Sequence, residues 1–262
     1  MADNWTSFFI PLLFAQVVGD FVLQTDAVAK AKRERKAGAL FYHTVTHVVT
    51  AYVMLGLARA WPVALLVAAM HGLQDGLKER LAARCRPPEV APRGRVTIFA
   101  VDQGLHVLVA ALLAVWLAQR GTGTSLWLSL AGGSYPRVLV VVTGLIVSVE
   151  VGKVLIGMLT APYAARVRRD ASPPAGEADP PSDVHVAIGR VERTLVYLLV
   201  VTGNMAAVGF VVAAKSVFRF GDLAKANQRH EAEYILVGSL MSFTWAVFIG
   251  WLASWVLAGG LL

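Results

Sequence analysis

Four pairs of polar residues, each with its members four positions apart, occur in the first 106 positions of this 262-residue chain. The pairs are Asp20 with Gln24, His43 with His47, His71 with Asp75, and Asp102 with His106. On an α-helix, this spacing places both members of a pair on one face, one turn apart. Imidazole nitrogens and carboxylate oxygens bind zinc and other first-row divalent metals. The pattern therefore predicts a metal site built from four helices.

The residue types suggest different roles within such a site. The predicted metal ligands are His43, His47, His71, Asp75 and His106. Asp20 and Asp102 are predicted to be further ligands or the general base or acid of a reaction. Three protein ligands and a water make a catalytic zinc site, so the set suffices for one or two ions, with zinc favoured.

Three more polar residues are predicted to support this site. Lys78 lies one turn beyond Asp75, where it either contacts an anionic substrate or only extends its ammonium to the membrane surface. Gln24 and Gln103 are expected to hydrogen-bond to the ligands, as outer partners of metal ligands commonly do.

The composition is that of a polytopic membrane protein. Hydrophobic residues make up 56% of the chain and charged residues only 16%, whereas soluble domains are nearer 45–50% and one quarter. The net charge of +7 would suggest nucleic-acid binding in a soluble protein. In a membrane protein it indicates Lys- and Arg-rich cytoplasmic loops, so no nucleic-acid partner is expected. The N-terminus lacks the features of a cleaved signal peptide, and Cys85 is the only cysteine.

The apolar segments predict an all-α membrane bundle of about seven transmembrane helices. They cover about residues 5–23, 40–58, 63–81, 96–117, 137–159, 191–218 and 234–257. We expect a four-helix bundle with the His/Asp cluster over 1–120 and a fifth span with its connections over 121–169. A flexible cytoplasmic linker rich in Pro, Ala and acidic residues is expected over 170–188, and C-terminal membrane helices over 189–262.

The basic loops predict the orientation of the chain. The strongest Lys/Arg clusters follow the first and third spans, so these loops should be cytoplasmic and the N-terminus outside. All four polar pairs then lie within about 5–15 Å of the cytoplasmic surface. Arg219, Lys225 and Arg229 fit this scheme badly. Either these three residues are an exception to the preference of Lys and Arg for cytoplasmic loops, or the C-terminal half contains a broken or re-entrant helix.

The segment Gly19–Asp26 (GDFVLQTD) resembles the opening motif of a bacterial membrane family catalogued as domain of unknown function 3307. Further matching features are His43 with His47, His71 to Lys78 (HGLQDGLK), Asp102-Gln103 with His106, Gly189 to Arg193, Ala213 to Ser216, Arg219-Phe220, Glu233-Tyr234 and Gly238 to Leu240. The resemblance implies a multi-pass protein of the bacterial inner membrane and brings no established activity. A weaker similarity is to bacterial membrane-bound metal-dependent hydrolases, which share intramembrane His and Asp motifs.

Three functions are compatible with such a site. The leading hypothesis is a metal-dependent hydrolase that acts on a lipid or lipid-linked substrate at the cytoplasmic leaflet. The first alternative is a transporter or channel for divalent cations or protons, although the outer halves of the first four spans show few polar residues beyond Thr50 and Tyr52. The second is a non-catalytic scaffold with a closed, structural metal site. Membrane lipids are the expected partners, and a homodimer is compatible with the sequence.

Overall fold

A computed structural model describes residues 5–56, 61–84, 92–120, 125–170, 183–225 and 229–260. Within these ranges, every element of regular secondary structure is a helix. Cys85 and residues 171–182 of the expected linker lie outside the described residues. The chain divides into two compact units, one of residues 1–146 with 256–262 and one of residues 147–255.

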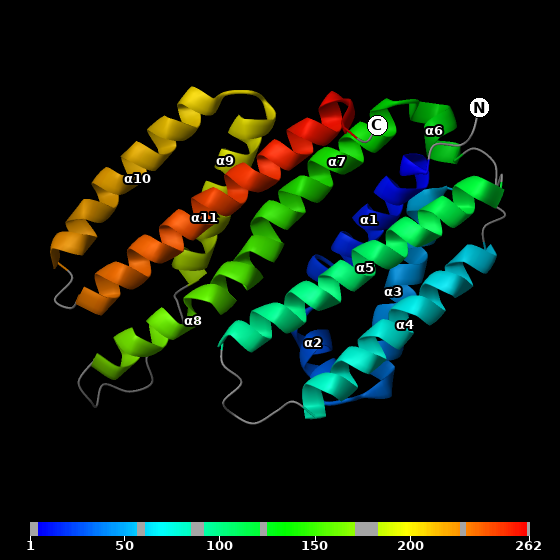
Figure 1. Ribbon diagram of the computed structural model, residues 1–262, viewed down its shortest axis with the longest axis horizontal. Coiled ribbons are helices and arrows are strands. Elements are labelled where there is room, and N and C mark those ends of the chain that lie inside the picture. Colours follow the sequence, from blue (N-terminus) through cyan, green and yellow to red (C-terminus); the bar gives the residue numbers. More distant parts are fainter. Residues whose placement is uncertain are drawn as a thin grey trace. The chain divides into compact units, whose positions relative to one another are not determined.

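The first unit contains the helices that carry the four polar pairs (Figure 1). Its helices are α1 (Thr6–Phe21), α2 (Asp26–Arg33), α3 (Ala37–Leu55), α4 (Trp61–Arg84), α5 (Pro92–Arg120), α6 (Leu126–Ala131), α7 (Ser134–Ile146) and the short π-helix η2 (Val256–Gly260). Helix α1 packs against α3, α5 and α7, and α3 packs against α4. The expected bundle of residues 1–120 is thus part of a larger unit.

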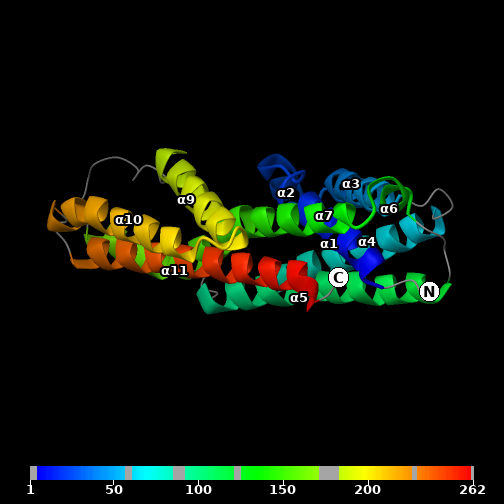
Figure 2. The same cartoon turned by 90° about the horizontal axis from the view of Figure 1, so that it is seen from above.

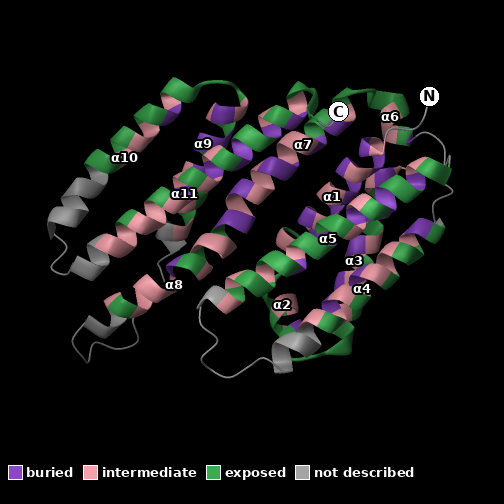
Figure 3. Cartoon of the chain, in the orientation of Figure 1, coloured by how far each residue is buried: buried purple, intermediate pink, exposed green. Residues whose placement is uncertain are grey.

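One buried face of α3 explains how polar and apolar residues share this interior. Its buried residues are His43, His47, Ala51 and Leu55, each four positions from the next. His43 and His47 place imidazoles on this face. Ala51 and Leu55 continue it and belong to an apolar core with Leu12 and other residues of α1, α4 and α5. Figure 3 shows the buried positions along these helices. The apolar core therefore fixes the helices that position the histidines.

The first expected span ends earlier than predicted. Helix α1 ends at Phe21, and α2 starts at Asp26, with the Oγ1 of Thr25 accepting a hydrogen bond from the backbone N–H of Val28 at 3.3 Å. The two helices are bent by 83° at this break, which is visible in Figure 2. Gln24 lies between the helices, so the expectation that it shares a helix face with Asp20 is wrong.

The second unit holds η1 and the four remaining helices. They are the π-helix η1 (Val147–Val151), α8 (Gly152–Asp170), α9 (Asp183–Val201), α10 (Met205–Lys225) and α11 (Arg229–Trp255). Helix α11 packs against α8 and α9. The expected sixth span over 191–218 is wrong, because the chain breaks between α9 and α10. Gly203 adopts a φ of 78° there, and Asn204 Nδ2 donates to Thr202 Oγ1 at 2.9 Å. The structure therefore has two helices, α9 and α10, where one span was expected, and both explanations of the loop charges near Arg219 stay predictions.

Three helical stretches in the described residues are long and apolar enough to cross a membrane, or up to four if α1 and α2 form one bent span. They are Gly94–Arg120, Ser134–Val167 and Glu233–Gly260. Helices α3 and α4 are not among them, and both carry polar site residues, which lower mean hydropathy. The count of seven spans and the outside location of the N-terminus remain predictions.

Candidate metal centre

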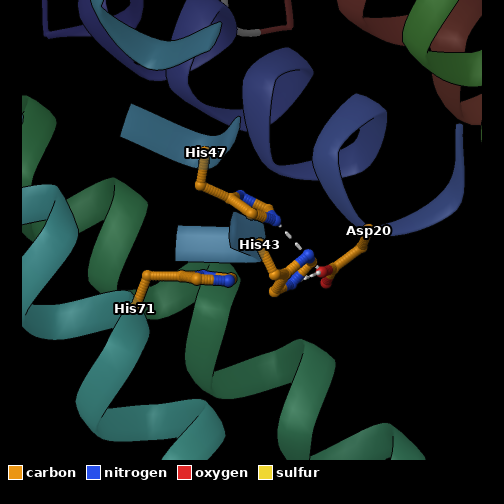
Figure 4. Close-up of side chains that lie close together, drawn as sticks. All are labelled: Asp20, His43, His47 and His71. Carbon is orange, nitrogen blue, oxygen red and sulfur yellow. Dashed lines mark hydrogen bonds and ion pairs between the residues drawn. The ribbon is translucent and has the colours of Figure 1, made fainter. Parts of the chain in front are cut away.

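The structure brings the histidines and aspartates of the four pairs together within the first unit. Asp20 comes from α1, His43 and His47 from α3, His71 and Asp75 from α4, and Asp102 and His106 from α5. Their side chains form two groups that could hold a metal ion. One is Asp20, His43, His47 and His71, drawn in Figure 4, and the other is His71, Asp75 and His106. Within each group the ligand atoms lie within 4.8 Å of one another, and His71 belongs to both.

Two distances in the first group match the separation of ligands around a tetrahedral metal ion. Asp20 Oδ1 lies 3.2 Å from the Nε2 of His43 and 3.2 Å from the Nε2 of His47. Figure 4 shows both rings directed toward this carboxylate. Ligand atoms bound tetrahedrally to zinc at about 2.0–2.1 Å are separated by about 3.3 Å. The geometry therefore fits one zinc-sized ion among these side chains.

Several buried imidazole nitrogens lack a hydrogen bond. Both ring nitrogens of His71 and the Nε2 of His43 are buried without such a partner. His43 Nε2 does lie close to two carboxylates, 3.2 Å from Asp20 Oδ1 and 3.3 Å from Asp75 Oδ2. An unsatisfied buried polar group destabilises a fold by about 1–3 kcal/mol. Metal coordination would satisfy His43 Nε2 and one nitrogen of His71, and this observation supports a metal site more directly than the residue types do.

The Asp20 carboxylate is oriented by two amides. Its Oδ2 accepts hydrogen bonds from Gln16 Nε2 at 2.8 Å and from Gln103 Nε2 at 3.3 Å, which leaves Oδ1 to face the imidazoles. Gln103 also donates to Asp102 Oδ2 at 3.3 Å, in the supporting role expected for it. Gln16 was missed by the sequence analysis. Its position four residues before Asp20 on α1 was the available signal.

A backbone carbonyl sets the tautomer of His106. Its Nδ1 lies 2.8 Å from the carbonyl oxygen of Asp102, and a carbonyl only accepts hydrogen bonds, so Nδ1 carries the proton of the neutral ring. Its Nε2 then bears the lone pair and is buried without a hydrogen-bond partner. Metal-binding histidines commonly donate from the other ring nitrogen in this way. His106 is therefore prepared to bind a metal through Nε2.

Two lysines pair with the remaining carboxylates. Lys78 Nζ lies 2.6 Å from Asp102 Oδ2, and Lys32 of α2 forms an ion pair with Asp75. Lys32 also donates to Gln24 Oε1 at 3.0 Å, so Gln24 contacts the site through this lysine rather than through Asp20. Lys32 was missed, because nothing in the spacing distinguishes it from the other cations of its basic segment.

Close packing holds the imidazole rings in place. The rings of His47 and His71 stack with centroids 3.6 Å apart, and His47 also packs against α1 at Gly19. A Cβ atom at that position would lie only 2.4 Å from His47 Cε1. The absence of a side chain at Gly19 thus lets α3 bring its imidazole next to Asp20.

A small cavity of about 40 Å³ adjoins the histidines. Its polar lining comes from Gln16, His47, His71, Gln74 and His106. The rest of its lining is apolar and comes from Leu12, Ala15, Ala51, Val67, Met70, Val109, Ala110 and Leu113. A water needs roughly 10–15 Å³ of such space and two or more polar partners. The cavity therefore has room for on the order of three waters beside the imidazoles.

The fold and the cluster together define an all-helical protein with candidate membrane spans and a buried His/Asp site able to hold a metal. Residues 8–131 match the family described as "Protein of unknown function (DUF3307)". This match confirms the resemblance to that family over residues that include the whole His/Asp cluster. The C-terminal segments that also resemble the family, from Gly189 onward, lie beyond the matched residues. No curated protein and no solved structure matches the chain. The similarity to membrane-bound metal-dependent hydrolases thus stays a prediction.

Proposed function

We propose that this protein is a metal-dependent hydrolase of the bacterial inner membrane that cleaves a lipid or lipid-linked substrate at the cytoplasmic leaflet. The observation that carries this proposal is the group of Asp20, His43, His47 and His71, whose atoms have metal-ligand spacing while imidazole nitrogens lack hydrogen bonds. Charged and imidazole groups among apolar helices are costly and commonly mark functional sites.

The metal would be held by this group, with zinc favoured by its ligand types. When bound, such an ion lowers the pKa of a coordinated water toward neutrality and polarises the bond to be cleaved. The adjoining cavity provides a place for that water next to His47 and His71. Gln16 and Gln103 orient Asp20 toward the ion, so its carboxylate acts as a ligand.

Asp102 is the proposed general base or acid. Its carboxylate is buried, lies 3.8 Å from His106 Nδ1 and accepts from Lys78 and Gln103. In this arrangement Lys78 fixes Asp102 while remaining about one third exposed. Lys78 therefore connects the buried carboxylates to the edge of the site, where it can also contact an anionic headgroup.

The position and lining of the site favour a lipid substrate. The cavity is large enough for water and too small for an acyl chain, so a lipid tail would remain in the membrane while its polar bond reaches the ligands. Exposed basic residues lie on and just after α2, the helix whose Lys32 reaches the cluster. They are Lys30, Arg33, Arg35 and Lys36. Each basic residue near a membrane surface contributes about 1 kcal/mol toward binding anionic lipids.

The change Asp102→Asn tests this function. It removes the charge of the proposed base while keeping a side chain of nearly the same shape. Cells that express the wild type should lose a lipid or gain a lipid fragment relative to cells that express Asp102→Asn, as measured by lipidomics at equal expression. Asp26→Asn makes the same chemical change at an exposed position of α2 and should behave as the wild type.

Two other results would replace this proposal. Equal lipid profiles together with divalent-ion flux into vesicles that depends on Asp102 would establish a transporter. Equal lipid profiles with bound metal, no flux and reduced thermal stability on metal removal would establish a structural metal site. The apolar residues that line the cavity beyond the histidines, including Leu12, Val67 and Leu113, favour the hydrolase over an ion path.

A further inference from the structure

Lys32 places an ammonium group inside the cluster from outside the four helices that carry the ligands. Its side chain is 7% exposed, although neighbouring cations of the same segment, Lys30 and Arg33, are exposed. The bend after α1 turns α2 toward the site, and Lys32 is the buried residue of that helix. Its Nζ contacts Asp75 Oδ2 and Gln24 Oε1.

The oxygen that Lys32 contacts is also the one that faces the imidazoles. Asp75 Oδ2 lies 3.3 Å from His43 Nε2 and 3.8 Å from His71 Nε2. Asp75 belongs to the second ligand group, with His71 and His106. A metal ion in this group and the ammonium of Lys32 would compete for the same carboxylate.

The charges of the cluster favour the ammonium over a second ion. Asp20, Asp75 and Asp102 contribute three negative charges, and Lys32 and Lys78 contribute two positive ones. With neutral imidazoles, Asp75 with Lys32 and Asp102 with Lys78 are neutral pairs, and Asp20 is left with a charge of minus one. A divalent ion at Asp20 changes this charge to plus one, whereas an ion at the pair of Asp75 and Lys32 would change a neutral pair to plus two. Net charge is strongly disfavoured in a buried, apolar surrounding. The lysines therefore leave Asp20, of these three carboxylates, to a divalent ion.

We infer that the cluster takes one divalent ion, on Asp20, His43, His47 and His71, and that the ammonium of Lys32 occupies the place of a second ion at Asp75. This inference rests on the metal site of the proposed function and determines its stoichiometry. In two-metal hydrolases the second ion stabilises charge on the reacting oxygens. Here Lys32 supplies that positive charge without coordination.

Removal of the ammonium should admit a second ion. In Lys32→Met the side chain keeps its length, and Asp75 is left as an unpaired buried carboxylate, a state that is strongly destabilising. A cation bound by Asp75, His71 and His106 relieves this. A neutral imidazole ligates one ion, so in this variant the first ion keeps Asp20, His43 and His47. Zinc titration of purified protein, followed by elemental analysis, should give one ion per chain for the wild type and two for Lys32→Met.

Two further variants isolate the role of the charge. Lys36→Met removes an exposed lysine of the same segment, which pairs with Glu34 at 2.7 Å, and should still bind one ion. The double change Lys32→Met with Asp75→Asn removes the ammonium and the carboxylate together and should return the stoichiometry to one. Its single ion would show that the second ion of Lys32→Met requires Asp75.

The outcomes separate this inference from the function on which it rests. Two ions in the wild type, or one ion in a folded Lys32→Met, would overturn the inference and leave the metal site intact. The wild-type stoichiometry decides the question even if Lys32→Met does not fold. No stoichiometric metal in the wild type would overturn the metal site itself.

Discussion

The side chains of the cluster are held by contacts with residues that are not themselves ligands. Gln16 and Gln103 fix Asp20, the backbone of Asp102 fixes His106, and Gly19 makes room for His47. The helical spacing predicted the histidines and aspartates, because chemistry and periodicity are both visible in a sequence. It could not predict Lys32, because a bend of the backbone, rather than a spacing, brings this lysine inside.

The first residue-scale prediction concerns Gly19→Ala. The new methyl group would overlap the His47 ring, which lies 2.4–2.7 Å from the position of the added Cβ, so His47 must move away from Asp20. We expect zinc affinity to fall by at least about tenfold, equivalent to about 1.4 kcal/mol. Competition with a zinc chelator measures this change.

Gly104→Ala is the matched control for this change. It adds the same methyl group to α5, beside Gln103, where no atom lies within 4 Å of the added Cβ. Its zinc affinity should equal that of the wild type. Unchanged zinc affinity in Gly19→Ala would mean that His47 is not a ligand.

The helical periodicity of the sequence predicted which faces of the helices are buried better than it predicted where the helices end. The buried stripe of α3 follows the expected spacing of four, since the same residues that face the core define the pattern. The end of α1 at Phe21 and the break at Gly203 were missed. Hydropathy averaged over a span hides both, although polar residues mark them: Asp20 and Gln24 flank the end of α1, and Thr202 and Asn204 flank Gly203. The Gly203-Asn204 sequence was the available signal of the break between α9 and α10.

A prediction at the element scale concerns the packing of α8 in the second unit. A Cβ atom at Gly152 would lie 2.7 Å from Trp245 Cδ1 and 3.2 Å from Arg193 Cδ. Arg193 is itself anchored, because its Nη2 donates to the carbonyl oxygen of Val149 in η1 at 3.1 Å. Gly152→Ala should therefore lower the free energy of unfolding by about 1–3 kcal/mol, as overpacking of a core commonly does. Thermal unfolding in detergent measures this effect.

The control for Gly152→Ala lies on the same helix. Gly157→Ala places its methyl group where no atom lies within 4 Å, and alanine is favoured over glycine in a helix by about 0.5–1 kcal/mol. Gly157→Ala should thus keep or raise the stability of the wild type. Equal destabilisation by both changes would show that contact with Trp245 does not determine the effect.

At the scale of the whole molecule, composition predicted the class of the fold, an all-helical chain with apolar helices. The number of spans could not be predicted in the same way. The polar residues that form the site reduce the apolar character of α3 and α4, and three helical stretches, or up to four, are apolar enough to cross a membrane by themselves. Helices that bury polar residues against each other can still enter a bilayer, because the polar groups then face a protein interior.

The orientation of the chain can be tested with its single cysteine. Cys85 lies in the most basic loop predicted from the sequence, so it should face the cytoplasm. A membrane-impermeant maleimide should label it in inverted inner-membrane vesicles and leave it unlabelled in cells with only the outer layer permeabilised. Labelling in those cells would invert the orientation and place the cluster near the outer leaflet.

The metal content of purified protein is the most direct test of the metal site. We expect one divalent ion per chain, with zinc favoured, after preparation in metal-replete medium and dialysis. His71→Ala should remove it, because His71 belongs to both ligand groups, while Gly104→Ala should retain it. A folded wild type without stoichiometric metal, or a His71→Ala variant with undiminished metal content, would contradict the account.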